Sequence, residues 1–145
     1  MNGFNLSEAD EREYTKLIAE DLESGALAKV IELFRYNKTL YQVVANLLQD
    51  NRMKVRLGAN MLIDELREEK PDDVKLALPG LLPLLSNESP TIRGDAADMV
   101  GMIGSDEHIP YLKNLLEDQN QQVIEIVEEA IDTIRDNGSN IQSFE

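Results

Sequence analysis

Three stretches of this 145-residue chain align with one another without gaps, and this repetition constrains the fold more than any other feature of the sequence. They start at Tyr41, Leu78 and Ile109. A repeat of this size predicts stacked units, each burying its apolar face against its neighbours. The matching columns are Leu47/Leu84/Leu115, Leu48/Leu85/Leu116, Asp50/Asn87/Asp118, Val55/Ile92/Val123, Ala59/Ala96/Val127, Leu62/Met99/Ala130 and Leu66/Ile103/Ile134.

Each repeat is typical of two helices joined by a short polar turn. In the first repeat the apolar residues of the second helix follow the spacing i, i+4, i+7, i+11, which places them on one side of that helix. These residues are Val55, Ala59, Leu62 and Leu66. We therefore expect the apolar columns to form the core. Leu62, Leu66, Leu85 and Leu116 are predicted to be buried.

Polar residues, prolines and glycines predict where the helices begin and end. The turn column offers side-chain oxygens to the free amides at the start of each second helix. Pro90 stands at such a start, and Gly104 and Gly138 follow the second helices as expected stops. Gly94 and Gly101 lie inside a predicted helix, where each costs about 1 kcal/mol. Close approach of a neighbouring backbone or a ligand would explain them, and so would simple tolerance.

This pattern resembles the HEAT-repeat family, particularly its short HEAT-like and phycobilisome-lyase-type members. In that family a proline often bends the first helix, an Asp follows in the turn, and an Arg lies six residues further on. The matching residues here are Pro79, Pro83 and Pro110 for the proline, and Asp50 with Arg56 and Asn87 with Arg93 for the Asp–Arg pair. The third repeat departs from the pattern, because Ile124 occupies the arginine position. We therefore expect the side-chain ladder between repeats to stop before the last one.

The resemblance covers about residues 41–136 and implies an all-α fold. That fold is an α-solenoid, a right-handed superhelix of antiparallel helix pairs. The predicted repeats span about 41–70, 72–104 and 108–136 within a repeat region of 41–138. Residues 1–40 are predicted to form an N-terminal helical capping region, with Ser7 capping its first helix and Gly25 ending it. Residues 139–145 are expected to be a flexible tail, and the whole chain one domain.

The charge of the chain excludes one class of partner and suggests another. Its 14 Lys and Arg residues stand against 28 Asp and Glu residues, a net charge of −14. Such a field repels phosphate backbones, so we expect no nucleic-acid partner. The chain has no cysteine, which removes disulfides and thiolate metal sites. No apolar run reaches a membrane span of roughly 18 residues, and the first residues have no signal-peptide core. We therefore expect a cytoplasmic protein without a membrane partner.

Catalytic, cofactor and metal sites are not predicted. His108 is the single histidine, and we expect it to be an exposed turn residue rather than a metal ligand. No glycine-rich loop has phosphate-binding spacing, and no segment has the pattern of a calcium loop. The paired acids at 68–69, 72–73 and 128–129 are interpreted as solvated surface. The chain is therefore not expected to be an enzyme.

A binding surface is the remaining prediction. In HEAT-type stacks the second helices line the concave side, and the side of these helices away from the core carries mostly acids with a few apolar residues. The candidate partner-binding residues are Leu57, Met61, Asp64, Glu65, Asp95, Asp98, Met102, Glu125, Glu129 and Asp132. Such a face suits a basic protein segment with an apolar anchor. It is equally typical of a surface that only keeps a protein soluble.

Two other functions follow from the resemblance. HEAT-like repeat proteins assist bilin attachment to phycobiliproteins, so a lyase or chaperone-like helper for a chromophore or cofactor protein is the alternative. That role requires an apolar slot with a few polar anchors. Nucleic-acid repair on a HEAT-like scaffold requires a basic face, and the net charge of −14 argues against it.

Overall fold

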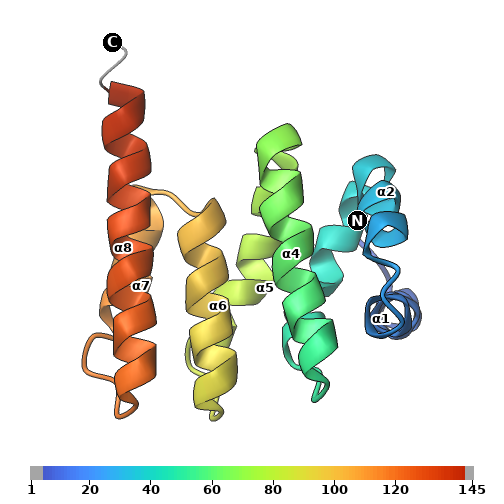
Figure 1. Ribbon diagram of the computed structural model, residues 1–145, viewed down its shortest axis with the longest axis horizontal. Coiled ribbons are helices and arrows are strands. Elements are labelled where there is room, and N and C mark those ends of the chain that lie inside the picture. Colours follow the sequence, from blue (N-terminus) through green and yellow to red (C-terminus); the bar gives the residue numbers. More distant parts are fainter. Residues whose placement is uncertain (1–4, 143–145) are drawn as a thin grey trace. The chain divides into compact units, whose positions relative to one another are not determined.

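The computed structural model describes the backbone of residues 5–142 and the side chains of residues 5–138, and within that range it contains helices and no strand (Figure 1). The chain divides into two compact units, one ending at Gly80 and one beginning at Leu81. The expected all-α class is therefore confirmed. The division into a capping region, three repeats and a tail within one domain stays a prediction.

The first unit consists of short and long helices in succession. Its elements are α1 (Glu8–Glu23), α2 (Leu27–Tyr36), the 3₁₀ helix η1 (Lys38–Val43), α3 (Val44–Leu48), α4 (Met53–Glu69) and the 3₁₀ helix η2 (Asp73–Ala77). The boundary between the units falls inside α5 (Leu78–Leu84). The second unit continues with α6 (Pro90–Ile103), the 3₁₀ helix η3 (Asp106–His108), α7 (Ile109–Lys113) and α8 (Gln121–Gln142).

The N-terminal helices begin and end where their sequence predicts. Ser7 caps α1, and its hydroxyl accepts a hydrogen bond from the amide of Asp10 at 3.1 Å. Gly25 separates α1 from α2 with a φ of +87°, a left-handed conformation that glycine adopts without steric cost. Phe34 and Tyr41 then pack edge to face, with ring centroids 5.1 Å apart. This ring contact joins α2 to η1.

The aligned apolar columns supply a large part of the core. All four predicted residues of α4 are fully buried, as are Ala96 and Met99 of α6 and Val127 of α8. Glycines let the helices of the second unit approach closely, since a Cβ atom on Gly101 would stand 2.7 Å from the Cβ of Ala130. Helices α6 and α8 therefore lie side by side along much of their length (Figure 1). Close backbone approach, one of the two explanations offered for this glycine, is the one that the structure supports.

The three turns repeat one hydrogen-bond pattern. In each, a side-chain oxygen of the turn column accepts a hydrogen bond at 2.9 Å from the amide two residues further on. The donors are the amides of Arg52, Ser89 and Asn120. The sequence prediction for the turn column is thus confirmed. Each turn leads directly into a second helix. The same side-chain-to-amide hydrogen bond therefore precedes α4, α6 and α8.

Two helix-end and core predictions are wrong. Leu116 is 37% exposed, and its neighbour Leu115 is buried instead. Helix α7 ends at Lys113, so the following residues lie in a turn whose side-chain directions no longer follow the helical period. Gly138 does not end the last helix, because α8 continues to Gln142. The helical part of the chain therefore extends into the expected tail, whose residues 143–145 lie outside the described residues.

Candidate protein-binding surfaces

The first candidate surface is the solvent side of α4 in the first unit. Met53, Leu57 and Met61 lie there at the spacing i, i+4, i+8, and each is more than half exposed. Asp64 and Glu65 follow one turn further along and are also exposed. Asp64 accepts a salt bridge from Arg67 at 2.8 Å, which neutralises part of the acidic end. The surface is thus an apolar row that ends in carboxylates.

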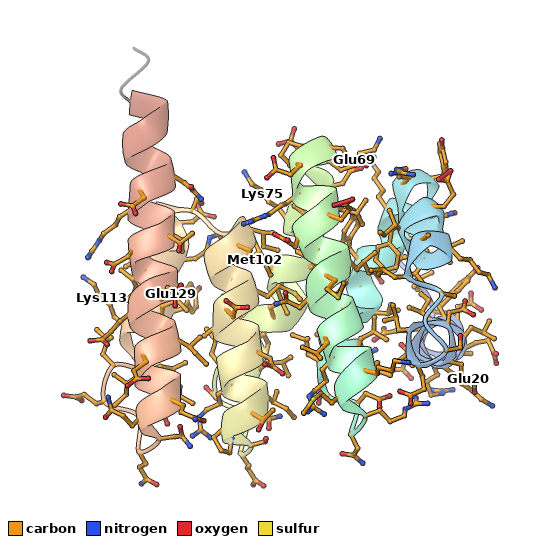
Figure 2. All side chains as sticks on the ribbon, in the orientation of Figure 1. Glu20, Glu69, Lys75, Met102, Lys113 and Glu129 are labelled. Carbon is orange, nitrogen blue, oxygen red and sulfur yellow. The ribbon has the colours of Figure 1, made fainter. Side chains whose placement is uncertain are left out.

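The second candidate surface belongs to α6 and α8 in the second unit. The row on α6 is Thr91, Asp95, Asp98 and Met102, and the row on α8 is Glu125, Glu129, Asp132 and Asp136. Both rows follow the spacing i, i+4, i+7, i+11 and avoid the buried residues of their helices. Asp98 and the four acids of α8 are exposed, whereas Asp95 and Met102 are partly exposed. Figure 2 labels Met102 and Glu129 on these adjacent helices.

The structure therefore brings six of the ten predicted residues together on two packed helices. These are Asp95, Asp98, Met102, Glu125, Glu129 and Asp132. The other four lie together on α4 of the first unit, and they are Leu57, Met61, Asp64 and Glu65. No predicted residue is buried. Their role in binding a partner stays a prediction.

An ion pair between Arg93 and Asp118 links two turns of the second unit. The sequence indicated only one of its two members. Nε and Nη2 of Arg93 donate to the two carboxylate oxygens of Asp118 at 2.8 and 2.9 Å. Nη1 donates to the carbonyl oxygens of Asn87 and Glu88. The family pattern indicated an arginine six residues after Asn87, but it did not identify Asp118 as the acceptor. The expectation that the side-chain ladder stops before the last repeat is wrong, because Asp118 belongs to that repeat and accepts from Arg93. One guanidinium group therefore holds its own turn and the next one together.

Removing this charge pair should make the unfolding free energy less dependent on pH. Hydrogen bonds from Arg93 and then from the Asn120 amide lower the pKa of Asp118 below its ordinary value. A lowered pKa stabilises the folded state above the ordinary pKa, and the stabilisation is lost as the pH falls through the lowered value. We expect Asp118→Asn to cost about 1–3 kcal/mol at pH 7 and progressively less in acid. Urea unfolding across the acidic range measures this.

Asp50→Asn is the matched comparison, because the Asp50 carboxylate has a lowered pKa from hydrogen bonds with Arg52 of its own turn. Asp50 contacts only its own turn through these bonds, whereas Asp118 joins two turns. We therefore expect the smaller loss for Asp50→Asn. A pH profile of Asp118→Asn that runs parallel to that of the wild type would contradict the assignment.

His108 is not the exposed turn residue that the sequence suggested. It is 9% exposed, and its Nδ1 accepts a hydrogen bond from the amide of Ser105 at 3.0 Å. Together with the Ser105 side chain this forms a reciprocal capping box around η3. Gly104 packs against this ring, since a Cβ atom there would lie 3.3 Å from Nδ1. The histidine thus has a structural role in the turn before α7.

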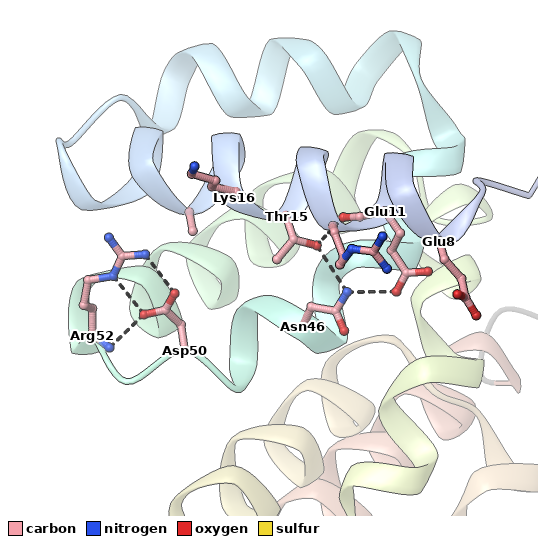
Figure 3. A pocket seen from close by; sticks show the side chains of 9 residues that line it. Glu8, Glu11, Thr15, Lys16, Asn46, Asp50 and Arg52 are labelled. Atoms are coloured by element: carbon pink, nitrogen blue, oxygen red, sulfur yellow. Dashed lines mark hydrogen bonds and ion pairs between the residues drawn. The ribbon is translucent and has the colours of Figure 1, made fainter.

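A polar pocket of about 740 Å³ lies in the first unit between α1 and the turn before α4 (Figure 3). Asn46 donates to Glu11 and Thr15 on one side of it, and Asp50 pairs with Arg52 on the other. The remaining lining residues are Glu8, Arg12, Lys16 and Ala19. The three acids and three bases of the lining balance, so the pocket has no net charge that would select an ion. No sequence motif indicated it.

Within the part of the chain that the structure describes, no group of three or more His, Cys, Asp or Glu residues is placed to hold a metal ion. None of the described helices is long and apolar enough to cross a membrane.

Comparison with known proteins agrees with the repeats. A family model described as HEAT repeats matches residues 41–132, which is more than half of the chain. No curated protein and no solved structure gives a match. HEAT repeats generally mediate protein–protein interactions, and proteins built from them are generally non-enzymatic scaffolds. The matched region contains the three repeated turns and every aligned column position except Ile134, and the chain belongs to the HEAT-repeat family.

Proposed function

We propose that the protein is a non-enzymatic binding module that holds a basic segment of a protein partner against the acidic faces of its second helices. The observation that carries this proposal is the pair of rows on α6 and α8. Between them they contain six carboxylates and no Lys or Arg. Residues 81–145 contain three Lys and Arg against thirteen Asp and Glu, so this part of the chain has a large excess of negative charge.

The charges of the rows would attract a cationic segment, and apolar residues beside them would then hold it. Aligned carboxylates on neighbouring helices create a field that raises the association rate of a cationic segment, and salt weakens that field. Apolar contacts then slow dissociation. Met102 can supply such a contact beside the acidic rows of the second unit. A segment bound on α4 of the first unit would find its apolar contacts at Leu57 and Met61. A partner segment with Lys or Arg residues and an apolar side chain satisfies both requirements.

Reversing charge on α8 should weaken this partner. Glu125 and Glu129 are exposed and lie outside the buried side of α8, so Glu125→Lys with Glu129→Lys is expected to leave the fold intact. We expect affinity for the partner to fall by about tenfold or more at low salt, and the loss to shrink as salt rises. Affinity capture from the native host with wild-type protein identifies the partner, and titration calorimetry at two salt concentrations measures the effect.

A matched control changes the same net charge elsewhere in the unit. Glu88 and Glu117 lie in the turns before α6 and α8, and both are exposed. Glu88→Lys with Glu117→Lys should retain most of the affinity, because neither residue belongs to the two rows. Equal losses for the two double variants would show that net charge rather than the row geometry determines binding, and no loss for either would exclude the acidic face.

A further inference from the structure

The hairpin of α1 and α2 exposes four large apolar side chains that neither the repeats nor the proposed function uses. Tyr14 is 38% exposed and Leu17 50% exposed on α1. Leu33 is 36% exposed and Tyr36 77% exposed on α2. Single exposed apolar residues are ordinary, but a contiguous set of them indicates an interaction surface.

Helix geometry and one ion pair place them on the same side. Tyr14, Leu17 and Asp21 follow the spacing i, i+3, i+7 along α1. On α2, Lys29, Leu33 and Tyr36 follow the spacing i, i+4, i+7. Each set forms one row on its helix, and Lys29 Nζ lies 3.4 Å from Asp21 Oδ2. Because this pair joins the two rows next to the Gly25 turn, the four apolar residues form one face, which we call the hairpin face.

An exposed apolar face is unexpected on a pair of helices that already has a buried apolar side. Here Leu and Tyr occupy exposed positions, although α1 and α2 bury other apolar residues such as Ile18 and Phe34. Tyrosine is also enriched among residues that dominate binding energy at interfaces. The hairpin face thus has the composition of a surface that a binding partner covers.

Charges around the hairpin face select what covers it. Three exposed acids lie on the same part of α1 as Leu17. Glu20 is three residues from Leu17, Glu13 is four and Asp10 is seven. The only base within the two rows, Lys29, already pairs with Asp21. A second copy of this chain would bring its own acids to the same border. Each copy has a net charge of −14. Like charges disfavour that copy, whereas Lys or Arg residues complement the border.

We propose that the hairpin face binds an amphipathic helix of another protein, whose apolar side is bordered by Lys or Arg residues. Two neighbouring helices with exposed apolar rows form a surface on which a third helix can pack with its own apolar row, as in other helical packing. The apolar row of that helix contacts Leu17 and Leu33, and its basic border faces Glu13 and Glu20. This surface shares no residue with the acidic rows on α6 and α8.

Two synthetic helical peptides test the proposal. Both have one leucine row at i, i+3, i+4, i+7 spacing, and the positions beside that row are Lys in one peptide and Glu in the other. We expect the Lys peptide to shift the amide resonances of α1 and α2 in ¹⁵N-labelled protein, and the Glu peptide to leave them in place. Leu17→Glu combined with Leu33→Glu should weaken binding of the Lys peptide at least tenfold. Circular dichroism checks that this variant remains helical.

Leu76→Glu is the matched control. Leu76 is a leucine of similar exposure (47%) in the same unit, but it lies on η2. It should leave binding of the Lys peptide unchanged. Equal weakening by Leu76→Glu, or equal binding of the Glu peptide, would overturn the proposal. So would shifts confined to α6 and α8, which would instead support the acidic rows. Sedimentation that shows a dimer abolished by Leu17→Glu would identify a second copy as the occupant and would also overturn it.

Discussion

Replacing Leu62 with alanine is expected to lower the free energy of unfolding by about 2–5 kcal/mol. Leu62 is fully buried in α4, between Ala59 and Leu66, which are also fully buried. Truncation removes apolar contacts and leaves a cavity that the surrounding helices can fill only in part. Urea unfolding followed by far-ultraviolet circular dichroism measures the loss. It should be among the largest of any single substitution in the chain.

Leu57 provides the comparison for this loss. It lies in the same helix but is 55% exposed, so Leu57→Ala should change the unfolding free energy by only about 0.5 kcal/mol. The same contrast is expected between Leu115 and Leu116, which are adjacent in sequence and differ in burial. If the two members of either pair lost equal stability, the assignment of the core would be wrong.

The second large effect is expected at Gly101, where any side chain collides with the neighbouring helix. A Cβ atom there would lie 2.7 Å from the Cβ and 2.9 Å from the Cα of Ala130. Because the Cα belongs to the backbone, α6 and α8 must move apart to admit a methyl group. Gly101→Ala gains about 1 kcal/mol of helix propensity, but overpacking of this kind costs typically 1–3 kcal/mol. We therefore expect net destabilisation, and a greater loss for Gly101→Val.

Gly94 lies in the same helix and should respond with the opposite sign. Its Cβ atom would lie 3.1 Å from Cδ1 of Ile126, which is the end of a flexible side chain and can rotate away. Gly94→Ala should therefore be neutral or stabilising by up to about 1 kcal/mol. Thermal unfolding of the two variants separates the effects. Partial rescue of Gly101→Ala by Ala130→Gly would confirm the contact, and destabilisation of equal size at Gly94 and Gly101 would contradict it.

The repeated columns predicted the core because helical periodicity and burial are coupled wherever a regular helix is present. Val55, Ala59, Leu62 and Leu66 show this in α4. The column failed at Leu116, since gapless alignment assumes that every first helix has the same length. Helix α7 ends earlier, and the direction of a side chain in a turn depends on contacts that no single-residue preference encodes.

Two other predictions failed because local preference was outweighed by context. Glycine at 138 is unfavourable in a helix by about 1 kcal/mol, which the rest of α8 outweighs. His108 is buried beside Gly104, and two residues four apart in a turn give no periodic signal in the sequence. By contrast, Asp50, Asn87 and Asp118 were predictable, because an Asx side chain reaches the amide two residues on without help from the rest of the fold.

The candidate surfaces were predictable in part. The acidic rows followed from helical spacing once the buried side of each helix was known, as Glu125 and Glu129 illustrate. The hairpin face was missed, although the spacing of Tyr14, Leu17 and Asp21 was present in the sequence. Residues before Tyr41 did not align with the repeats, so no template identified which of their apolar residues face the core. Only the Lys29–Asp21 contact shows that the two rows share one side.

The Arg93 guanidinium has a consequence for protein engineering. It binds the carbonyl oxygens of its own turn and the carboxylate of Asp118 in the next, so donor and acceptor are distributed over two consecutive modules. A designer who exchanges the segment containing α6 without its neighbour would separate a charged donor from its acceptor and leave Asp118 largely shielded from water without a counterion. The smallest exchangeable part of this region is therefore a segment that begins before Asn87 and ends after Asp118.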